Sequence, residues 1–290
     1  LHVHMPNTSA FALLFFALQK PLIIHWHSDV LASKLDKKLA FFYPLYRIFE
    51  KSLLKKAHSI IATSASYLQA SQALFPFKNK CRVIPLGLNP KRYHLPSPAR
   101  IQSYKEKFSY RPIVLSVGRF TYYKGFSDLI QAARFLPEAV FVIIGDGPCR
   151  KQWVQLSQEL NVDKQTFFPG KISDQELQEW MSSCDIFCLP SIERTEAFGL
   201  VLLEAMFYAK PLVTTEVPGS GMNYVNQHKE TGITVKVNNP QELGSGLRQL
   251  LDNAEYRKDL GQAAYQRVNQ LFTIKQATKQ IKKLYLDYRD

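Results

Sequence analysis

The stretch PIVLSVGRFTYYKG, residues 112–125, contains a short apolar run from Ile113 to Val117 and then changes character at Gly118-Arg119. An apolar run of this length without polar alternation predicts a strand that is buried on both faces of a parallel sheet. Lys124-Gly125 follow at the point where a helix is expected to begin. The stretch therefore predicts a strand, a polar loop and a helix start, which is the repeating unit of α/β proteins.

The same unit recurs toward the C-terminus. Helices are expected at 125–135, 149–160, 174–183 and 200–208, and further strands at 140–144, 166–168, 186–189, 212–214 and 233–235. This alternation predicts a doubly wound parallel sheet. In such sheets ligands bind in the crevice at the carboxyl ends of the strands.

The N-terminal part shows a shorter series of the same kind. We expect strands at 21–26 and 81–88, an amphipathic helix at 39–56 with a break or first turn at Pro44, and a strand, turn and helix within 59–74. Residues 89–110 carry three prolines and no clear period, which is typical of an interdomain connection. The predicted division is 1–108 for a partial N-terminal domain, 109–272 for a C-terminal domain, and 273–290 for a helix that packs back toward the first domain.

The bulk composition limits the classes of protein. The chain has 290 residues, a formal net charge of +13 and four cysteines, and no Asp-x-Asp sequence. Scattered cysteines without histidine partners disfavour structural zinc, and we expect no bound metal and no cofactor.

There is no recognisable secretory signal, so a cytoplasmic location is expected. The opening LHVHMP reads as the end of a strand, and we expect an N-terminally incomplete first domain.

The string EAFGLVLLE, residues 196–204, places two carboxylates on either side of a predicted helix start. Phe198-Gly199 should open the helix, and the free N–H groups there favour an anion such as a diphosphate. Glu196 and Glu204 could then accept hydrogen bonds from hydroxyl groups at the two ends of one nucleotide sugar. The alternative is an ordinary surface helix with an acidic residue before it.

Arg119 and Lys124 form a second constellation. Both follow a predicted strand, so both are expected in the crevice at the carboxyl end of the sheet. A bidentate guanidinium and an ammonium can stabilise a diphosphate leaving group without a metal ion. The alternative is a solvated basic turn.

Three further motifs have less specific meanings. His27, in the string HWHSD at residues 25–29, follows a predicted strand and is a candidate for a site or a structural histidine. The turn GDGP at 145–148 lacks the third glycine of a dinucleotide fingerprint, which favours a tight strand-to-helix turn. Ser173 and Glu176 have the spacing of a capping box.

Together these motifs resemble the family 4 glycosyltransferases. The strings SVGRFTYYKG, VIIGDGP, FFPGKISD, CDIFCLPS, EAFGLVLLEAM and KPLVTT occur in the order found in that family. PLIIHWHSDV and VPGSGMNYVN look like bacterial members that transfer mannose, rhamnose or N-acetylhexosamine to surface polysaccharides. The resemblance implies an α/β GT-B fold of two Rossmann-like, doubly wound parallel-sheet domains, the first of them truncated here.

The resemblance also implies roles for individual residues. Arg119 and Lys124 would hold the donor diphosphate, Glu196 would lie by the donor sugar, Glu204 would bind the ribose, and His27 would line the sugar pocket. The remaining residues expected at the donor are Gly118, Ile172, Asp174, Phe198, Gly199 and Leu200. Asp174, near the base, would slightly favour guanine.

The implied activity is metal-independent, retaining transfer of a hexose-type sugar from a GDP- or UDP-linked donor to a glycan or lipid-linked glycan. The alternative is a catalytically incomplete donor-binding subunit that needs a missing segment or a partner chain. The basic segment 34–56 suggests peripheral contact with the inner face of the membrane, or else a normal packed helix with a solvated basic face. Dispersed lysines without interleaved aromatic residues argue against nucleic acid as a partner.

Overall fold

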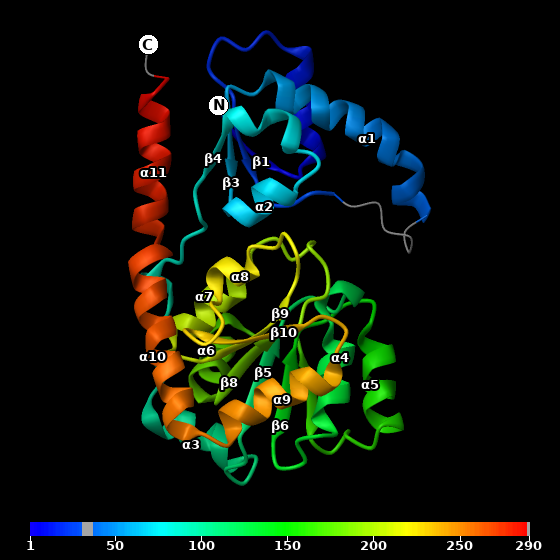
Figure 1. Cartoon of the computed structure of the whole chain (residues 1–290), viewed down its shortest axis with the longest axis vertical. Coiled ribbons are helices and arrows are strands. Elements are labelled where there is room, and N and C mark those ends of the chain that lie inside the picture. The colour runs from blue at the N-terminus through cyan, green and yellow to red at the C-terminus, as the bar shows by residue number, and fades with distance from the viewer. Residues whose placement is uncertain (31–36, 289–290) are drawn as a thin grey trace.

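The computed structural model describes residues 1–30 and 37–288, which form two parallel sheets stacked one above the other (Figure 1). The smaller sheet has the order β1-β2-β3-β4 and the larger one the order β10-β9-β8-β5-β6-β7, and each pair of neighbouring strands is parallel. The architecture is therefore the two-sheet α/β fold that the sequence predicts.

The smaller sheet is built from four short strands, of which the two central ones are fully buried. Its strands are β1 His2–Met5, β2 Ile23–Trp26, β3 Ser59–Ala62 and β4 Cys81–Val83. Its surroundings include the 3₁₀ segments Thr8–Phe15 (η1) and Phe75–Lys80 (η2) and the helices α1 Lys37–Lys56 and α2 Ala65–Ala70. The predicted break at Pro44 is wrong, because α1 continues through that proline.

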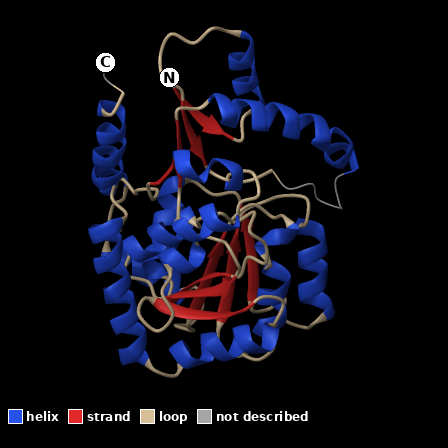
Figure 2. Ribbon diagram, turned by 45° about the horizontal axis from the view of Figure 1, so that its top comes forward, coloured by secondary structure: helices blue, strands red, loops and turns tan. Residues whose placement is uncertain are grey.

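The larger sheet alternates strictly between strand and helix. Its strands are β5 Ile113–Val117, β6 Val140–Ile144, β7 Thr166–Gly170, β8 Ile186–Leu189, β9 Leu212–Glu216 and β10 Gly232–Lys236. The helices around it are α4 Phe126–Ala133, α5 Arg150–Glu159, α6 Asp174–Ser183, α7 Leu200–Phe207, α8 Met222–Val225, α9 Pro240–Leu251 and α10 Ala254–Leu271. Figure 2 shows helices on both faces of this sheet.

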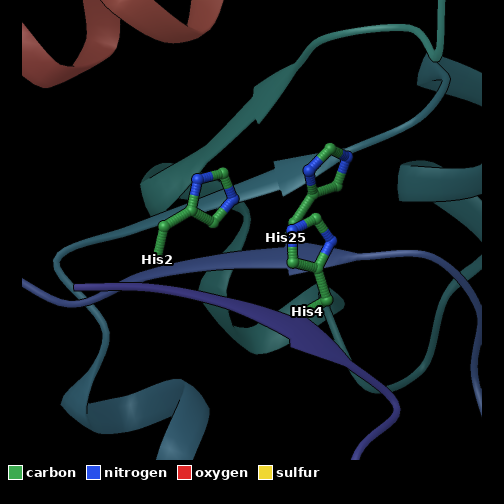
Figure 3. Close-up of side chains that lie close together, drawn as sticks. All are labelled: His2, His4 and His25. Carbon is green, nitrogen blue, oxygen red and sulfur yellow. The ribbon is translucent and has the colours of Figure 1, made fainter.

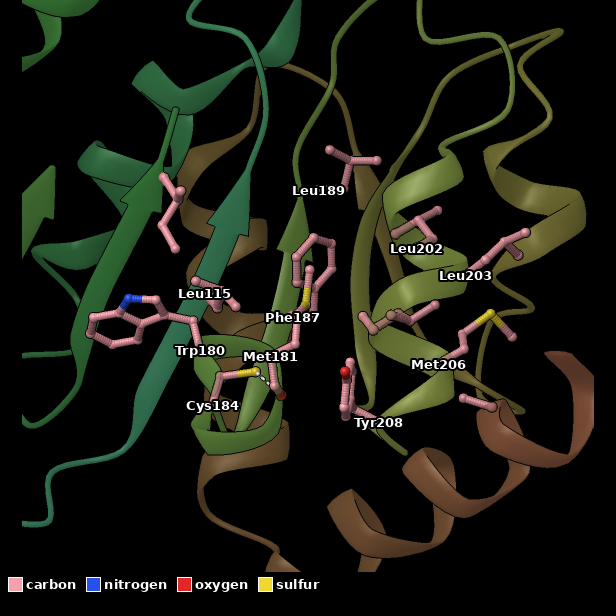
Figure 4. Close-up of a cluster of buried hydrophobic side chains, with 14 of the residues drawn as sticks. Leu115, Trp180, Met181, Cys184, Phe187, Leu189, Leu202, Leu203, Met206 and Tyr208 are labelled. Atoms are coloured by element: carbon pink, nitrogen blue, oxygen red, sulfur yellow. Dashed lines mark hydrogen bonds between the residues drawn. The ribbon is translucent and has the colours of Figure 1, made fainter. Parts of the chain in front are cut away.

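Alternate residues of the strands in the larger sheet pack into two separate hydrophobic cores, one on each face. Ile113 and Leu115 face one cluster with Phe187, Leu202 and Met206, part of which Figure 4 shows, while Val114 belongs to the cluster on the opposite face. A strand buried on both faces has no need of polar alternation, which explains the continuous apolar runs in the sequence.

The connection between the sheets packs mainly on the larger one. It contains η3 Pro90–Arg92 and α3 Pro98–Glu106, and Tyr104 and Phe108 belong to a core cluster of the larger sheet. The Arg100 side chain also pairs with Glu179 of α6 at 2.9 Å. We therefore propose that the second domain begins near Leu88, earlier than the boundary at residue 108 that the sequence suggested.

The last helix, α11 Ile274–Leu286, leaves the larger sheet and lies along the smaller one (Figure 1). Leu284 packs with Ile23 and Ile61, and the Tyr288 hydroxyl donates to the carbonyl oxygen of His58 at 3.1 Å. At the crossing point Leu88 exchanges two backbone hydrogen bonds of 2.8 Å with residues 272 and 274. Two chain segments thus pass side by side between the sheets.

Candidate functional site

The larger sheet reverses its direction of winding between β5 and β8, which are neighbours although they are far apart in sequence. Gly118-Arg119 follow β5, and the loop that leads to Glu196 follows β8. Loops that diverge at such a switch point leave a crevice at the carboxyl ends of the strands. A cavity of about 630 Å³ lies beside it and is lined by Val117, Gly118, Arg119, Ile144, Gly145, Asp146, Gly147, Lys171, Ile172 and Leu177.

Two glycines keep the wall of this cavity close-packed. Gly145 and Gly147 have φ values of +139° and +157°. A Cβ at Gly145 would lie 1.9 Å from the carbonyl oxygen of Gly118, and one at Gly147 would lie 2.6 Å from that of Phe120. The GDGP string is thus a tight turn between β6 and α5, as predicted.

Lys124 and Glu196, which belong to two separate sequence motifs, form an ion pair in the crevice. Lys124 Nζ lies 2.5 Å from Glu196 Oε2, and the two side chains are only 11% and 13% exposed. The lysine stem passes over Gly118, where a Cβ would lie 3.1 Å from its Cε. Ser191 Oγ approaches the same carboxylate oxygen at 3.4 Å. A cation and an anion are therefore held together where a charged ligand could interact with both.

The loop around Glu196 is supported from behind by residues 217–222. Ser220 Oγ donates to the carbonyl oxygen of Glu196, and the Gly221 N–H donates to that of Ala197 at 2.8 Å. Gly199, at φ +78°, then starts α7 with Phe198 buried beneath it and Leu200 exposed. The sequence-predicted helix start is confirmed, and its first N–H groups are available for an anion.

Glu204 lies further along the same helix, α7. Its Oε1 accepts a hydrogen bond from the Tyr93 hydroxyl at 3.2 Å. Burial raises the pKa of this carboxyl above its ordinary value, and the negative charge of Asp174 adds to the shift. Sequence patterns did not indicate Tyr93, because it lies in the irregular connection between the two sheets.

Asp174 and Ile172 occupy different environments near β7. The Asp174 side chain is 91% exposed and has Arg92 as an ion-pair neighbour at 4.0 Å. Ile172 is partly buried and lines the cavity. Between them, Ser173 and Glu176 form the predicted capping box at the start of α6.

His27 lies at the end of β2 in the smaller sheet. Its Nε2 is 2.7 Å from His4 Nδ1, and its ring stacks on that of His25 with 4.5 Å between centroids. Burial, followed by the neighbouring histidines, lowers its pKa to about 4. Among the described residues His27 makes no hydrogen bond with Lys124 or Glu196, so the structure does not join it directly to that pair.

Arg194 and Asp29 link the loops of the two sheets. Arg194 Nη2 lies 3.0 Å from Asp29 Oδ2, and the guanidinium lies over the ring of Tyr67, 5.4 Å from its centroid. Trp26 Nε1 and Ser71 Oγ donate to the other carboxylate oxygen of Asp29 at 2.9 and 2.6 Å. Sequence patterns did not indicate this pair, since its two residues are distant along the chain.

Two facing parallel sheets, with a basic and acidic crevice at a switch point of the larger one, define an α/β protein of the GT-B glycosyltransferase class. Residues 1–92 match the family described as Glycosyltransferase Family 4, and residues 100–267 match the one described as Glycosyl transferases group 1. The second match alone covers more than half of the chain, so the chain belongs to the group 1 glycosyl transferases.

Curated relatives include two bacterial sugar transferases. The chain is 31% identical over 256 residues to the D-rhamnosyltransferase WbpZ of Pseudomonas aeruginosa, with 88% of this chain covered. It is 30% identical over 251 residues to the O-antigen chain mannosyltransferase C of Escherichia coli, with 87% covered. The chain spans 65% of the length of each of these relatives.

Solved structures support the same fold. HepE of Anabaena, in complex with UDP, superimposes with a TM-score of 0.83 at 21% identity, over 99% of this chain and 78% of HepE. The sucrose-phosphate synthase of Thermosynechococcus elongatus gives a TM-score of 0.83 at 26% identity, over 99% and 72% of the two chains. At 21% identity, the similarity to HepE supports the fold alone.

Proposed function

We propose that this chain provides the donor site of a retaining glycosyltransferase that moves a hexose-type sugar from a nucleotide diphosphate to a glycan or lipid-linked glycan. The observation that carries the proposal is the Lys124–Glu196 pair, which is 2.5 Å apart and mostly buried at the switch point of the larger sheet. The similarity to a D-rhamnosyltransferase and to an O-antigen chain mannosyltransferase supports a hexose-type donor.

In the proposed complex the donor diphosphate lies between Arg119, Lys124 and the start of α7. Arg119 is exposed at the cavity edge and free to form bidentate hydrogen bonds, while Lys124 supplies a point charge. The backbone N–H groups of Gly199 and Leu200 add partial positive charge. These groups stabilise the negative charge that develops on the leaving diphosphate, so the proposed step uses no metal.

Glu196 and Glu204 are proposed to bind hydroxyl groups of the donor sugar and the ribose. When the diphosphate attracts Lys124, the Glu196 carboxylate becomes free to accept hydrogen bonds from sugar hydroxyls. Glu204 already accepts from the Tyr93 hydroxyl, so a ribose hydroxyl would occupy its remaining acceptor positions. His27, from the smaller sheet, is proposed to line the sugar pocket.

The bond changes follow the retaining mechanism that the family resemblance implies. The bond between the anomeric carbon and the diphosphate oxygen breaks, and the acceptor hydroxyl oxygen forms a bond on the same face. The acceptor proton passes to the leaving phosphate oxygen. The enzyme groups named above orient the donor and stabilise charge, and none of them becomes covalently bound.

The donor base is proposed to be uracil or guanine. UDP is the ligand in the HepE structure, which makes it one candidate to test, whereas the exposed carboxylate of Asp174 could accept from the N1 and N2 hydrogens of guanine. Thermal denaturation with UDP, GDP and ADP in parallel tests both, because ligands of the folded state raise the melting temperature. We expect one nucleotide to raise it.

Arg119→Ala should reduce that shift, since a lost charge-assisted hydrogen bond costs about 1.5–3 kcal/mol of binding free energy. Arg134→Ala, which changes an exposed arginine after α4, is the matched control and should retain the full shift. Failure of all three nucleotides to stabilise the wild-type chain would contradict the donor site. Binding without sugar transfer would instead favour a donor-binding subunit that needs a further segment or partner.

We also propose that α1 and the end of η1 contact an anionic membrane surface that carries the lipid-linked acceptor. Exposed aromatic and aliphatic side chains gather there, namely Phe15, Phe16, Phe41, Phe42, Leu45 and Ile48. Lys56 Nζ holds the two segments together by donating to the carbonyl oxygens of Leu13 and Phe16 at 2.8 and 2.7 Å. Lys51 and Lys55, which are also exposed on α1, supply positive charge near these apolar side chains.

This surface does not imply insertion across a bilayer. In the described part of the chain, residues 1–30 and 37–288, no helix combines the length and apolar character of a membrane-spanning segment. Flotation with vesicles of phosphatidylglycerol and of phosphatidylcholine tests the peripheral contact. We expect co-flotation with the anionic vesicles, its loss in a Phe41→Ser/Phe42→Ser variant, and its retention in Leu95→Ser, which removes an exposed leucine from the connection. Equal flotation of all three proteins would contradict the proposed surface.

A further inference from the structure

Four histidines, His2, His4, His25 and His27, gather on one face of the smaller sheet. In the parallel register of β1 and β2, His4 lies opposite His25, and residues two apart on a strand point to the same face. His2, His4 and His25 therefore project together, as Figure 3 shows. Their ring centroids are 5.1 Å apart for His2–His4 and His4–His25, and 5.6 Å apart for His2–His25.

The ring nitrogens of this cluster divide into two kinds. His2 Nδ1 lies 2.5 Å from the Tyr285 hydroxyl of α11, and His4 Nδ1 lies 2.7 Å from His27 Nε2. In contrast, His2 Nε2 and both ring nitrogens of His25 are buried without a hydrogen-bond partner among the described residues. His25 is only 6% exposed. Leaving a buried polar atom unpaired costs about 1–3 kcal/mol, so these nitrogens are unusual unless a ligand satisfies them.

The chemistry of the cluster favours a cation that accepts neutral imidazole. A neutral imidazole has one ring nitrogen with a lone pair available for a metal ion. The cluster has no carboxylate, which disfavours magnesium and calcium and suits a borderline metal such as zinc.

We propose that His2, His4 and His25 bind one divalent transition-metal ion, of which Zn²⁺ is the representative. One ring nitrogen from each residue lies within 4.8 Å of the others. Zinc–nitrogen bonds of about 2.1 Å need the ligand nitrogens roughly 3.4 Å apart, so small rotations of the three rings complete the site. The exposed side of His4 leaves a fourth position for water.

Outer hydrogen bonds already orient two of the three ligands. With Nδ1–H of His2 donating to the Tyr285 oxygen and Nδ1–H of His4 donating to His27, both Nε2 atoms carry lone pairs toward the ion. Such outer partners fix the tautomer and raise the basicity of a metal-bound histidine. Because Tyr285 belongs to α11, a bound ion would also fasten the last helix to the smaller sheet. Zn²⁺ binding does not require the proposed sugar transfer, although His27, the candidate for the sugar pocket, hydrogen-bonds to His4.

Calorimetric titration of the metal-free chain with Zn²⁺ tests the site, with Mg²⁺ as the comparison ion. We expect one saturable Zn²⁺ per chain, no Mg²⁺ binding, and a Zn²⁺-dependent rise in melting temperature that a chelator reverses. Substitution of Co²⁺ should give the absorption bands of tetrahedral cobalt. Wild-type protein that binds neither Zn²⁺ nor Co²⁺ would overturn the proposal.

Variants locate the ion. His4→Ala, at an exposed position, should abolish saturable binding, and Tyr285→Phe should weaken it about 10- to 100-fold through loss of the outer hydrogen bond. His94→Ala, an exposed histidine in the connection, is the control and should bind as the wild type does. If a folded His2→Ala/His4→Ala double variant binds Zn²⁺ unchanged, the histidines form only a structural stack.

Discussion

Arg194 of the larger sheet forms an ion pair with Asp29 of the smaller sheet, with 3.0 Å between Nη2 and Oδ2. Each residue lies in a loop at the carboxyl end of its sheet, after β8 and β2 respectively. Their side chains are 17% and 6% exposed, so solvent screens the pair weakly. The same loop continues to Glu196, which makes this contact a direct link between the smaller sheet and the proposed donor site.

Removal of the cation should destabilise the chain strongly. Arg194→Ala leaves the buried Asp29 carboxylate without its charge partner, and we expect a loss of about 3 kcal/mol in the apparent free energy of unfolding, measured with urea. Glu138→Ala breaks the Arg248–Glu138 pair, whose side chains are both 43% exposed, and should cost less than about 1 kcal/mol. Equal losses in the two variants would mean that the interdomain pair contributes no more than a surface pair.

Glu196 should be required for transfer, while its substitution should destabilise the chain without unfolding it, because Lys124 loses a buried charge partner. Glu196→Gln keeps the shape of the side chain and removes the charge that faces Lys124, so we expect kcat to fall by about 100-fold or more. Circular dichroism should be unchanged. Glu216→Gln, at an exposed position at the end of β9, serves as the control and should retain wild-type kcat. Wild-type turnover by Glu196→Gln would remove this residue from the proposed site.

The sequence predicted the larger sheet well because each of its strands is buried on both faces. Continuous apolar runs such as Ile113 to Val117, followed by glycine or charge, carry enough local information to place strand, loop and helix. Local chemistry likewise predicted the capping box at Ser173 and Glu176. The positions of Arg119, Lys124 and Glu196 at strand ends followed from the same alternation.

Contacts between segments that are distant along the chain could not be predicted from local sequence patterns. Nothing local to Tyr93 indicates that its hydroxyl reaches Glu204, and nothing near Asp29 indicates Arg194. The histidines of β1 and β2 also come together only through the parallel pairing of two strands, which no single stretch of sequence specifies. Periodicity reports which face of an element is buried, but not which element covers it.

The carboxyl of Glu204 should make stability depend on pH. Its pKa is raised by burial, so the folded state holds the proton more tightly than the unfolded state does. Stability therefore falls as pH rises from the ordinary glutamate value of 4.5 through the higher folded value, and the penalty persists at neutral pH. Glu204→Gln should remove this fall and raise the melting temperature of the free chain at pH 7.

The same substitution should weaken nucleotide binding, because an amide accepts hydrogen bonds from the ribose less strongly than a carboxylate does. Melting curves from about pH 4 to pH 8, with and without nucleotide, separate the two effects. Glu216→Gln, which changes an exposed glutamate, should leave both curves as in the wild type. A Glu204→Gln variant that is less stable than wild type at every pH would contradict the burial argument.

Gly87 should be intolerant of a side chain although its φ is not in the left-handed region. A Cβ there would lie 2.5 Å from the carbonyl oxygen of Thr273, a backbone atom fixed by the hydrogen bonds between Leu88 and the start of α11. Gly87→Ala must therefore push the two crossing segments apart, at a cost of about 1–3 kcal/mol. Gly244→Ala in α9 meets the side chain of Phe135 at 3.1 Å and the carbonyl oxygen of Ala132 at an ordinary contact distance of 3.6 Å, and it gains helix propensity. In urea denaturation, the free energy of unfolding of Gly87→Ala should be well below that of Gly244→Ala. Amide hydrogen exchange in α11 should become faster only in Gly87→Ala. Uniform protection of α11 in both variants would show that the crossing does not hold this helix on the smaller sheet.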